Sequence, residues 1–372
     1  MGKDNLKLII MENCKHLGTK VNDELKLIRN SQNGFTVKAE NPTFANSESK
    51  AVIQESVRGS DLFIFSDVGN YEMEYMYYGK ANRKSYNDHF VETLNMVDAC
   101  ANTPRRTWLF MPLLYASRQH KREGRESLNC AQSLRIYEFL GVNGIITFDP
   151  HDPAVRSALN RASFDTIYTT NTMVEHFLNV EDIDLNKLLV INPDAGATKR
   201  ANHFGRIFDA PVGGFKKVRD LSKVVNGTCQ IKTHEYTGNT PLEGRNLLVV
   251  DDIIASGKSM IDVASSAKMS GADKVFLFTT FGLFSDGEKS INNFNEAYAK
   301  KLIDKVYVTN LSYIPERFKK LDWIEIVDCA PTIAKIVSSL HDDESIAPFM
   351  NGAEEISEKI KAKKLGTYKK NI

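Results

Sequence analysis

Cysteine is scarce in this chain, and its spacing excludes several kinds of site. The 372 residues include five cysteines, with no C-x-x-C pair and no histidine at metal-ligand spacing from one of them. A cysteine-based zinc site or a disulfide framework is therefore not expected. Scattered, unpaired cysteines are typical of proteins in a reducing compartment, so we expect free thiols and a cytoplasmic location.

Net charge and long apolar runs are also lacking. The 48 basic residues nearly balance 47 acidic ones, which leaves a net charge of +1 and no global field to attract nucleic acid or an anionic membrane. No apolar run approaches the roughly 18 residues that a membrane-spanning helix needs. The first eleven residues contain no cleavage-site pattern. We therefore expect neither nucleic acid nor a membrane as a partner.

Short apolar runs, each followed by a helix-like amphipathic segment, recur along the chain. Strands that are buried on both faces appear as continuous apolar runs, and their alternation with helices indicates parallel α/β sheets. The strands are expected at residues 61–65, 107–111, 144–148, 188–192, 246–250, 274–279, 305–309 and 324–327. This number of strands and the chain length exceed what one core usually supports, so we expect two domains.

The domain boundary is placed where acidic and amide residues interrupt the apolar rhythm, near residues 180–187. This gives an N-terminal domain at 1–180, a second domain at 181–349 and a lysine-rich helical tail at 350–372. The tail is expected to be a solvated helix that frays. Residues 71–84 are rich in Tyr and Met, and they are interpreted as an insertion or an interface patch.

The most informative segment is 247–260, LLVVDDIIASGKSM. An apolar strand runs into two consecutive carboxylates, Asp251 and Asp252, and a loop of small residues then opens an amphipathic helix. Backbone N–H groups and the helix dipole form an anion site at such a helix start. The carboxylates can accept hydrogen bonds from the hydroxyls of a furanose ring. A phosphate at one end and a diol at the other match ribose 5-phosphate, whose predicted contacts are Asp251, Asp252, Ala255, Ser256, Gly257, Lys258 and Ser259.

Two other interpretations of this segment were weighed. The Gly-Lys-Ser triplet at 257–259 also occurs in Walker P-loops, but that motif requires glycine at position 252. Asp252 would repel a triphosphate, which excludes this possibility. A plain strand-to-helix turn with solvated aspartates stays open as an alternative.

The segment resembles the phosphoribosyl-diphosphate-binding loop that phosphoribosyltransferases share with ribose-phosphate diphosphokinases. It differs at Ala255, where Asp is usual, and at Lys258, where diphosphokinases favour Gly and hypoxanthine-type transferases are more similar to this chain. This loop alone does not choose between the two families.

Further segments resemble the diphosphokinases in the family's order, from about residue 6 to residue 349. They include ESVRGSDLFIFSDVG at 55–69, the loop at 44–48 before it, and a basic segment at 115–127 that begins with Tyr-Ala. In that basic segment the Arg-Gln pair is shifted by one position relative to the family. The resemblance implies that ATP contacts Phe44, Asn46, Ser47, Glu48, Arg118, Gln119 and His151.

Two strand ends resemble the family's metal-binding segments, FDPHDPAV at 148–155 and VINPDAGATKR at 190–200. The resemblance implies a Mg²⁺ cofactor near Asp149, His151 and Asp194, and Mg²⁺ takes few protein ligands because it keeps several waters. FKKVRD at 215–220 stands where the family has its flexible catalytic loop. Lys217 and Arg219 are then the catalytic pair, with Arg219 also near ribose 5-phosphate, although Lys216 competes with Lys217 for its role.

The chain is thus identified as a divergent member of the ribose-phosphate diphosphokinase family. The resemblance implies two tandem phosphoribosyltransferase-type domains, each a mainly parallel sheet flanked by helices. It implies transfer of the diphosphoryl group of ATP to C1 of ribose 5-phosphate, in a dimer-based homo-oligomer of up to six chains. Three alternatives stay open: a phosphoribosyltransferase, a catalytically silent regulatory homologue, and an enzyme for a different ribosyl phosphate.

Overall fold

The computed structural model describes residues 5–225, 228–351 and 353–370, with the backbone alone at 217–225, 228–234, 351 and 353–354. The chain forms two compact units, each assembled from segments that are far apart in the sequence. Unit 1 comprises Met1–Thr169, Asn310–Pro315 and Asp328–Asn351. Unit 2 comprises Thr170–Thr309, Glu316–Val327 and Gly352–Ile372.

Unit 1 is built on a five-stranded parallel sheet in the order β1-β4-β7-β8-β9. Its strands are β1 (Leu6–Ile10), β4 (Asp61–Phe65), β7 (Arg106–Phe110), β8 (Gly144–Phe148) and β9 (Ser163–Ile167). Every residue of β4 and of β8 is buried, as expected for strands covered on both faces. The helices of this unit are α1 (Lys15–Ile28), α2 (Tyr86–Ala99), α3 (Asn129–Phe139), α8 (Ala330–His341) and α9 (Ala347–Asn351).

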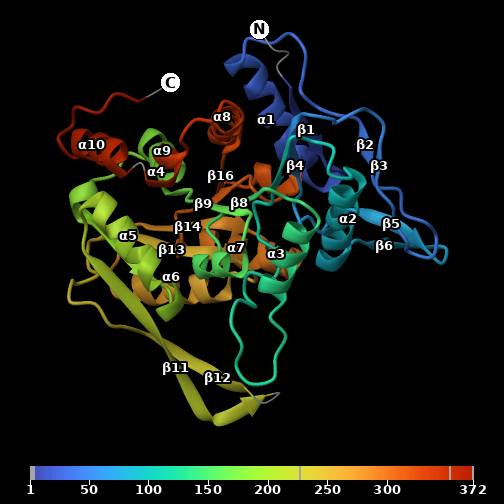
Figure 1. Cartoon of the computed structure of the whole chain (residues 1–372). Coiled ribbons are helices and arrows are strands. Elements are labelled where there is room, and N and C mark those ends of the chain that lie inside the picture. The colour runs from blue at the N-terminus through green and yellow to red at the C-terminus, as the bar shows by residue number, and fades with distance from the viewer. Residues whose placement is uncertain (1–4, 226–227, 352, 371–372) are drawn as a thin grey trace. The chain divides into compact units, whose positions relative to one another are not determined.

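Two small antiparallel pairs complete unit 1 (Figure 1). They are β2 (Ala39–Glu40) with β3 (Val52–Ile53), and β5 (Glu74–Tyr77) with β6 (Lys80–Arg83). The β5–β6 hairpin turns at Tyr78 and Gly79, which have positive φ angles of 46° and 75°. The Tyr- and Met-rich segment at 71–84 is therefore a hairpin.

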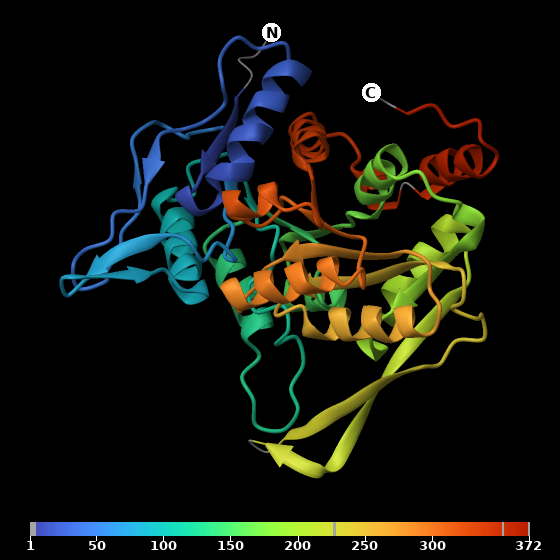
Figure 2. The ribbon, with the colours of Figure 1, turned by 180° about the vertical axis from the view of Figure 1, so that it is seen from behind.

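Unit 2 is built on a seven-stranded sheet in the order β12-β11-β10-β13-β14-β15-β16, parallel except for the β11–β12 pair. Its strands are β10 (Leu188–Asn192), β11 (Val212–Val225), β12 (Thr228–Tyr236), β13 (Asn246–Ile254), β14 (Val275–Gly282), β15 (Lys305–Thr309) and β16 (Ile324–Val327). Its helices are α4 (Thr170–Val180), α5 (Thr198–Phe208), α6 (Lys258–Met269), α7 (Glu288–Ala299) and α10 (Ala353–Lys364). The arms of β11 and β12 extend away from the body of the unit (Figures 1 and 2).

Short 3₁₀ helices join several of these elements. They are η1 (Glu12–Cys14), η2 (Pro153–Ala158), η3 (Leu185–Lys187), η4 (Ala195–Ala197) and η5 (Glu316–Lys320). Within the described parts of the chain, no helix is both long and apolar enough to cross a membrane. The four cysteines with described side chains, Cys14, Cys100, Cys130 and Cys329, are free and buried.

The architecture confirms the predicted α/β class, with two mainly parallel sheets flanked by helices. All eight predicted strands exist, and β13 runs four residues further than expected, to Ile254. The expectation of a solvated, fraying tail is wrong. Ile356 and Ile360 of α10 are 3% and 1% exposed and belong to the core of unit 2, because α10 packs against α4 and α5.

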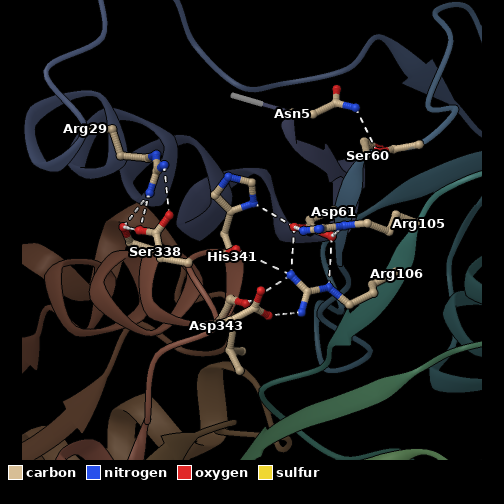
Figure 3. A network of polar contacts seen from close by, with 12 residues as sticks. Asn5, Arg29, Ser60, Asp61, Arg105, Arg106, Ser338, His341 and Asp343 are labelled. Carbon is tan, nitrogen blue, oxygen red and sulfur yellow. Dashed lines mark hydrogen bonds and ion pairs between the residues drawn. The ribbon is translucent and has the colours of Figure 1, made fainter. Parts of the chain in front are cut away.

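The returning helix α8 is tied to unit 1 by an ion-pair network at the amino end of the sheet (Figure 3). Its centre is Asp61, whose carboxylate is fully buried and accepts hydrogen bonds from Arg105 and Arg106. His341, the last residue of α8, lies with Nδ1 2.8 Å from Asp61 Oδ2. Arg29, the residue that follows α1, adds a hydrogen bond to Ser338 at 2.9 Å, which connects α8 to the end of α1 as well.

Candidate functional site

Three carboxylates gather where two neighbouring strands of unit 2 end. β10 and β13 run parallel and adjacent, with Ile191 opposite Val249, so their carboxyl ends meet at one edge of the sheet. Asp251 and Asp252 lie near the carboxyl end of β13. Asp194 follows β10 and is the N-cap residue of η4. We call Asp194, Asp251 and Asp252 the acidic trio. Such an edge is the usual ligand position in parallel α/β sheets.

Protonation of the acidic trio is controlled by burial and by like charge. Burial of Asp251 and the neighbouring charge of Asp252 raise the pKa of Asp251 to about 7, and Asp194 adds to the effect. A hydrogen bond from the backbone N–H of Asp252 to Asp251 Oδ1, 2.9 Å long, partly offsets this rise. Near neutral pH Asp251 is therefore partly protonated, and a cation or the hydroxyl donors of a sugar beside it would favour its ionised form.

The loop after β13 is held in place by its neighbours in unit 2. Ser285 donates its backbone N–H to the Ala255 carbonyl at 2.9 Å, and Ser290 Oγ donates to the Ser256 carbonyl at 3.2 Å. Gly257 then adopts a φ of 80°, in the left-handed region. A Cβ at this position would lie 2.3 Å from the Phe294 ring, so only glycine fits.

Helix α6 begins at Lys258, and its cap residue makes no side-chain hydrogen bond to the first turn. Its cap residue is Gly257, which has no side chain to accept from the first-turn N–H groups. The predicted residues Ser256, Lys258 and Ser259 flank this end, and Ser256 Oγ accepts only a long 3.4 Å bond from the Lys258 N–H. The structure thus brings the predicted anion site and the acidic pair together on one strand–loop–helix unit.

The predicted loop at 44–48 is a tight, exposed turn of unit 1. Phe44 donates its N–H to the Glu48 carbonyl at 2.7 Å, and Ser47 donates to the Phe44 carbonyl at 2.9 Å. Asn46 Oδ1 accepts from the Glu48 N–H at 3.3 Å. The Phe44 side chain is 49% exposed, and the Lys50 ammonium lies 5.8 Å from the centroid of its ring, so the accessible part of the ring could stack on a planar ligand.

Other predicted residues of unit 1 follow the carboxyl ends of β7 and β8. Arg118 and Gln119 are exposed in the segment after β7, and His151 is exposed just after β8. Sequence reasoning missed His120, whose ring centroid lies 5.2 Å from that of His151 and whose Nε2 lies 3.7 Å from Asp152 Oδ2. Its position next to Gln119 in the basic segment was the available signal.

Asp149 has a structural task in unit 1. Its side chain is buried, its φ is 40°, and its Oδ2 accepts from Thr169 Oγ1 at 2.9 Å and from the Thr169 N–H at 3.3 Å. The carboxylate therefore helps to fix the chain after β9. Asp149 is thus buried and hydrogen-bonded, whereas His151, two residues further along the chain, is exposed.

Lys217 and Arg219 lie on β11 of unit 2, in antiparallel register with His234 and Ile231 of β12. A register shift separates Val218 from Arg219. The segment was expected to be a flexible loop, and its backbone has strand geometry; β-branched residues recur along both arms. Their side chains lie outside the described part of the structure.

The chain is similar to known proteins along most of its length. Residues 6–141 match the model for the N-terminal domain of ribose phosphate pyrophosphokinase, and residues 235–350 match that for the phosphoribosyl synthetase-associated domain. A ribose-phosphate pyrophosphokinase of Mycoplasmopsis pulmonis is 25% identical over 350 residues, covering 93% of this chain and 97% of its own. One from Nostoc is 26% identical over 312 residues, covering 82% of this chain and 83% of its own.

The fold has a close counterpart among solved structures. The crystal structure of phosphoribosylpyrophosphate synthetase from Mycobacterium smegmatis superposes with a TM-score of 0.72 at 20% identity. The superposition covers 91% of this chain and 99% of that one. At this level of identity the match establishes the shared fold, with its two phosphoribosyltransferase-type domains.

Proposed function

Since the chain belongs to the ribose-phosphate pyrophosphokinase family, also called ribose-phosphate diphosphokinases, we propose that it transfers the diphosphoryl group of ATP to ribose 5-phosphate. The C1 hydroxyl of the sugar attacks the β-phosphorus, the bond from that phosphorus to the α-phosphate oxygen breaks, and AMP leaves. The products are phosphoribosyl diphosphate and AMP.

One observation carries the proposal for the acceptor: the acidic pair of β13 and the open amino end of α6 lie on a single strand–loop–helix unit. Asp251 and Asp252 would accept hydrogen bonds from the ribose hydroxyls. The 5-phosphate would receive the N–H groups of the first turn of α6, with hydroxyl donors from Ser256 and Ser259. Lys258 adds a positive charge beside the same phosphate.

Carboxylate oxygens are the preferred protein ligands of Mg²⁺, but the described residues contain no group of three His, Cys, Asp or Glu placed to hold a metal ion, so one or two carboxylates of the acidic trio would bind it and waters and substrate oxygens would supply its other ligands. Asp194 is the proposed ligand in unit 2, and exposed His151 is the proposed contact of the nucleotide's metal in unit 1. Asp149 is already engaged by Thr169, and we assign it a supporting place behind His151. When bound, Mg²⁺ would screen the charge of the polyphosphate.

The donor half of the reaction is proposed for exposed residues of unit 1 and for the β11 arm. Phe44 would stack on the adenine, with Asn46, Ser47 and Glu48 beside it, while Arg118 and Gln119 would meet the nucleotide's polar groups. Lys217 and Arg219 would stabilise the charge that develops on the transferred group. Positioning and charge stabilisation supply most of the catalysis in such transfers.

The test is AMP release from ATP and Mg²⁺, with and without ribose 5-phosphate, for the unsubstituted chain, Lys217→Ala and Lys216→Ala. We expect AMP only with the sugar present. Lys217→Ala should lower kcat by about 100-fold or more, the scale for loss of one preorganised charge-stabilising group. Lys216→Ala, the neighbouring control, should change kcat by less than about threefold.

Each alternative has its own outcome in this test. Consumption of phosphoribosyl diphosphate with a nucleobase, and no AMP from ATP, would indicate a phosphoribosyltransferase. No reaction with any sugar phosphate would indicate a regulatory homologue, and AMP with a different sugar phosphate would indicate a changed acceptor at Ala255. The proposed dimer-based oligomer is tested by light scattering of the same preparation.

A further inference from the structure

We infer that helix α2 positions the exposed turn at 44–48 through Glu92 and Asn95, and so sets the affinity for the nucleotide without touching it. The inference rests on the proposed function, because it takes this turn as an ATP contact. It assigns a role to two residues of α2 and to the β5–β6 hairpin, all within unit 1.

Glu92 holds the arm that enters the turn. Thr43 Oγ1 donates a hydrogen bond to Glu92 Oε1 at 3.4 Å, and Asn41 Nδ2 donates to the Glu92 backbone carbonyl at 3.2 Å. Thr43 directly precedes Phe44. The side chain and the backbone of one helical residue thus fix two points on the entering arm.

Asn95 holds the arm that leaves the turn. Its Nδ2 donates to the Ser49 carbonyl at 3.2 Å and to Ser49 Oγ at 3.3 Å. Ser49 directly follows Glu48. Because Glu92 and Asn95 are three residues apart on a helix, they lie on one face of α2 and reach both arms together.

The grip on the entering arm is itself fixed. Glu92 is 4% exposed, and its Oε1 is paired with the ammonium of Lys84, which is also buried. Lys84 follows β6, and its N–H donates to the Met73 carbonyl at 2.7 Å, which closes the base of the β5–β6 hairpin. Moving Glu92 would leave a buried ammonium unpaired, which is costly, so the carboxylate stays under Thr43.

The hairpin supplies a third point of support, at the tip of the turn. Tyr78 donates its backbone N–H to the Ala45 carbonyl at 3.2 Å. Tyr78 is a turn residue outside the paired positions of β5 and β6, so its N–H is available to a partner beyond the hairpin. Residues 71–84 thus connect the buried Lys84–Glu92 pair to the tip of the turn.

The turn needs such support because its own side chains are exposed from Phe44 to Glu48. An exposed turn with few buried contacts samples many conformations, and a ligand that selects one of them loses affinity accordingly. Support from α2 and the hairpin removes that loss before the nucleotide arrives.

The experiment compares Thr43→Val and Asn95→Ala, which each remove one grip without leaving a buried charge unpaired. Thr43→Ser keeps the hydroxyl and serves as the rescue variant. Thr103→Val is the matched control, since Thr103 Oγ1 donates a 2.9 Å bond to the carbonyl of Cys100, the residue after the carboxyl end of α2. Glu92→Gln is avoided because it would leave Lys84 without its counter-charge.

Two readouts are measured on the full chain. Hydrogen exchange of the peptide spanning 41–50, without nucleotide, should be faster in Thr43→Val and Asn95→Ala than in the parent, Thr43→Ser and Thr103→Val. In initial-rate assays, KM for ATP should rise about 3- to 10-fold in the two test variants, because each variant loses the hydrogen bonding of one side chain that holds the turn in place. KM for ribose 5-phosphate and kcat should stay within about twofold of the parent.

Unchanged exchange of this peptide in both test variants would overturn the inference. So would a rise in KM for ribose 5-phosphate equal to that for ATP, since it would indicate general damage to the fold. If the parent chain releases no AMP under any condition, the proposed function fails, whereas the exchange measurement still decides whether α2 holds the turn.

Discussion

Asp251 couples the chemistry of the acidic trio to the stability of unit 2. Burial and the charge of Asp252 raise its pKa to about 7, so the folded protein binds this proton far more tightly than an unfolded chain does. The raised pKa of Asp251 does not lower the free energy of unfolding at a pH below about 4, the pKa of aspartate in the unfolded chain. The cost grows as pH rises from there and is complete above pH 7.

Asp251→Asn should therefore stabilise the protein in a pH-dependent way. Asparagine resembles the protonated acid, so the urea midpoint should rise clearly at pH 8 and much less at pH 5. Asp286→Asn, at an exposed position, should shift the midpoint by little at either pH. An equal gain at both pH values would show that Asp251 is ionised in the folded protein at pH 5 as well.

Gly257 tests the loop that opens α6. Gly257→Ala should lower the free energy of unfolding by about 1–3 kcal/mol for the left-handed backbone, plus a similar amount for contact with Phe294. Gly244→Ala is the matched control, because Gly244 has a φ of 66° and open space around its Cβ position. Urea unfolding of the two variants should separate them, and equal losses would show that Phe294 moves aside.

Some residues were predictable from sequence because their chemistry depends on neighbours along the chain. Asp251, Asp252 and Gly257 share one segment, so their placement at a strand end and helix start was foreseen. Glu92 and Asn95 were not foreseen as supports, because their partners at 41–49 are about 50 residues away. Two single polar residues that contact each other over that sequence separation leave no local pattern in the sequence.

Among the elements, α10 departs most from expectation. Its sequence is rich in lysine and suggested solvent, yet Lys359 pairs with Glu175 at 2.7 Å and Lys363 donates to the Glu181 carbonyl at 3.0 Å. Lysine stems lie over apolar surface while their ammonium groups reach acceptors. Two isoleucines in a lysine-rich helix were too weak a pattern to predict burial.

Ile360→Ala measures how far α10 contributes to unit 2. The side chain is 1% exposed, so its loss should lower the free energy of unfolding by about 2–5 kcal/mol. Leu365→Ala, at a residue 78% exposed, should change it by less than about 0.5 kcal/mol. Thermal unfolding of both variants checks this, and equal effects would mean that α10 is solvated.

The strands show where periodicity suffices. Buried strands such as β8 and β10 match their predicted bounds, because continuous apolar runs mark them. β11 and β12 were missed, since a projecting hairpin has alternating polar residues that resemble a loop. β9 was missed too, because Ser163 and Asp165 break its apolar run.

For the whole molecule, sequence predicted two α/β domains from length and strand number. It gave no sign that each unit draws on segments from distant parts of the chain, because the interactions that recruit those segments lie far apart in sequence. Asp61 and His341 are one such pair. Asp67 is another, since its buried carboxylate accepts from the Tyr313 N–H at 2.7 Å and from Ser312 Oγ at 3.0 Å.

Asp61→Asn tests the network that recruits α8 to unit 1. Burial would raise the pKa of Asp61, but hydrogen bonds from Arg106, Arg105 and His341 outweigh it and hold the pKa well below its usual range. Because Asp61 is buried but its partners Arg105 and Arg106 are 54% and 26% exposed, loss of its charge should cost about 1.5–3 kcal/mol at pH 7. The stability that comes from the depressed pKa is fully present above the unfolded pKa of about 4 and is lost as pH falls toward the folded pKa. The difference in free energy of unfolding between the parent and Asp61→Asn should therefore narrow below about pH 4.

Asp343→Asn is the control for this network. Asp343 pairs with the same Arg106 but its side chain is 66% exposed, so its loss should cost about 1 kcal/mol or less. Urea unfolding of both variants between pH 3 and pH 7 measures the two deficits. A deficit for Asp61→Asn that stays constant with pH would rule out the ionised carboxylate as the source of the stability.

Unit 1 is assembled from early and late segments of the chain, and this affects its folding during synthesis on the ribosome. Leu17, Val21 and Leu25 of α1 are buried, and α1 packs against α8, which begins at Ala330. A nascent chain therefore carries α1 without this partner while all seven strands of the unit 2 sheet, β10 to β16, are being made. Chaperones that bind exposed apolar helices would act on the nascent chain during this interval. The unit that is synthesised first is completed only when residues 328–351 have left the ribosome.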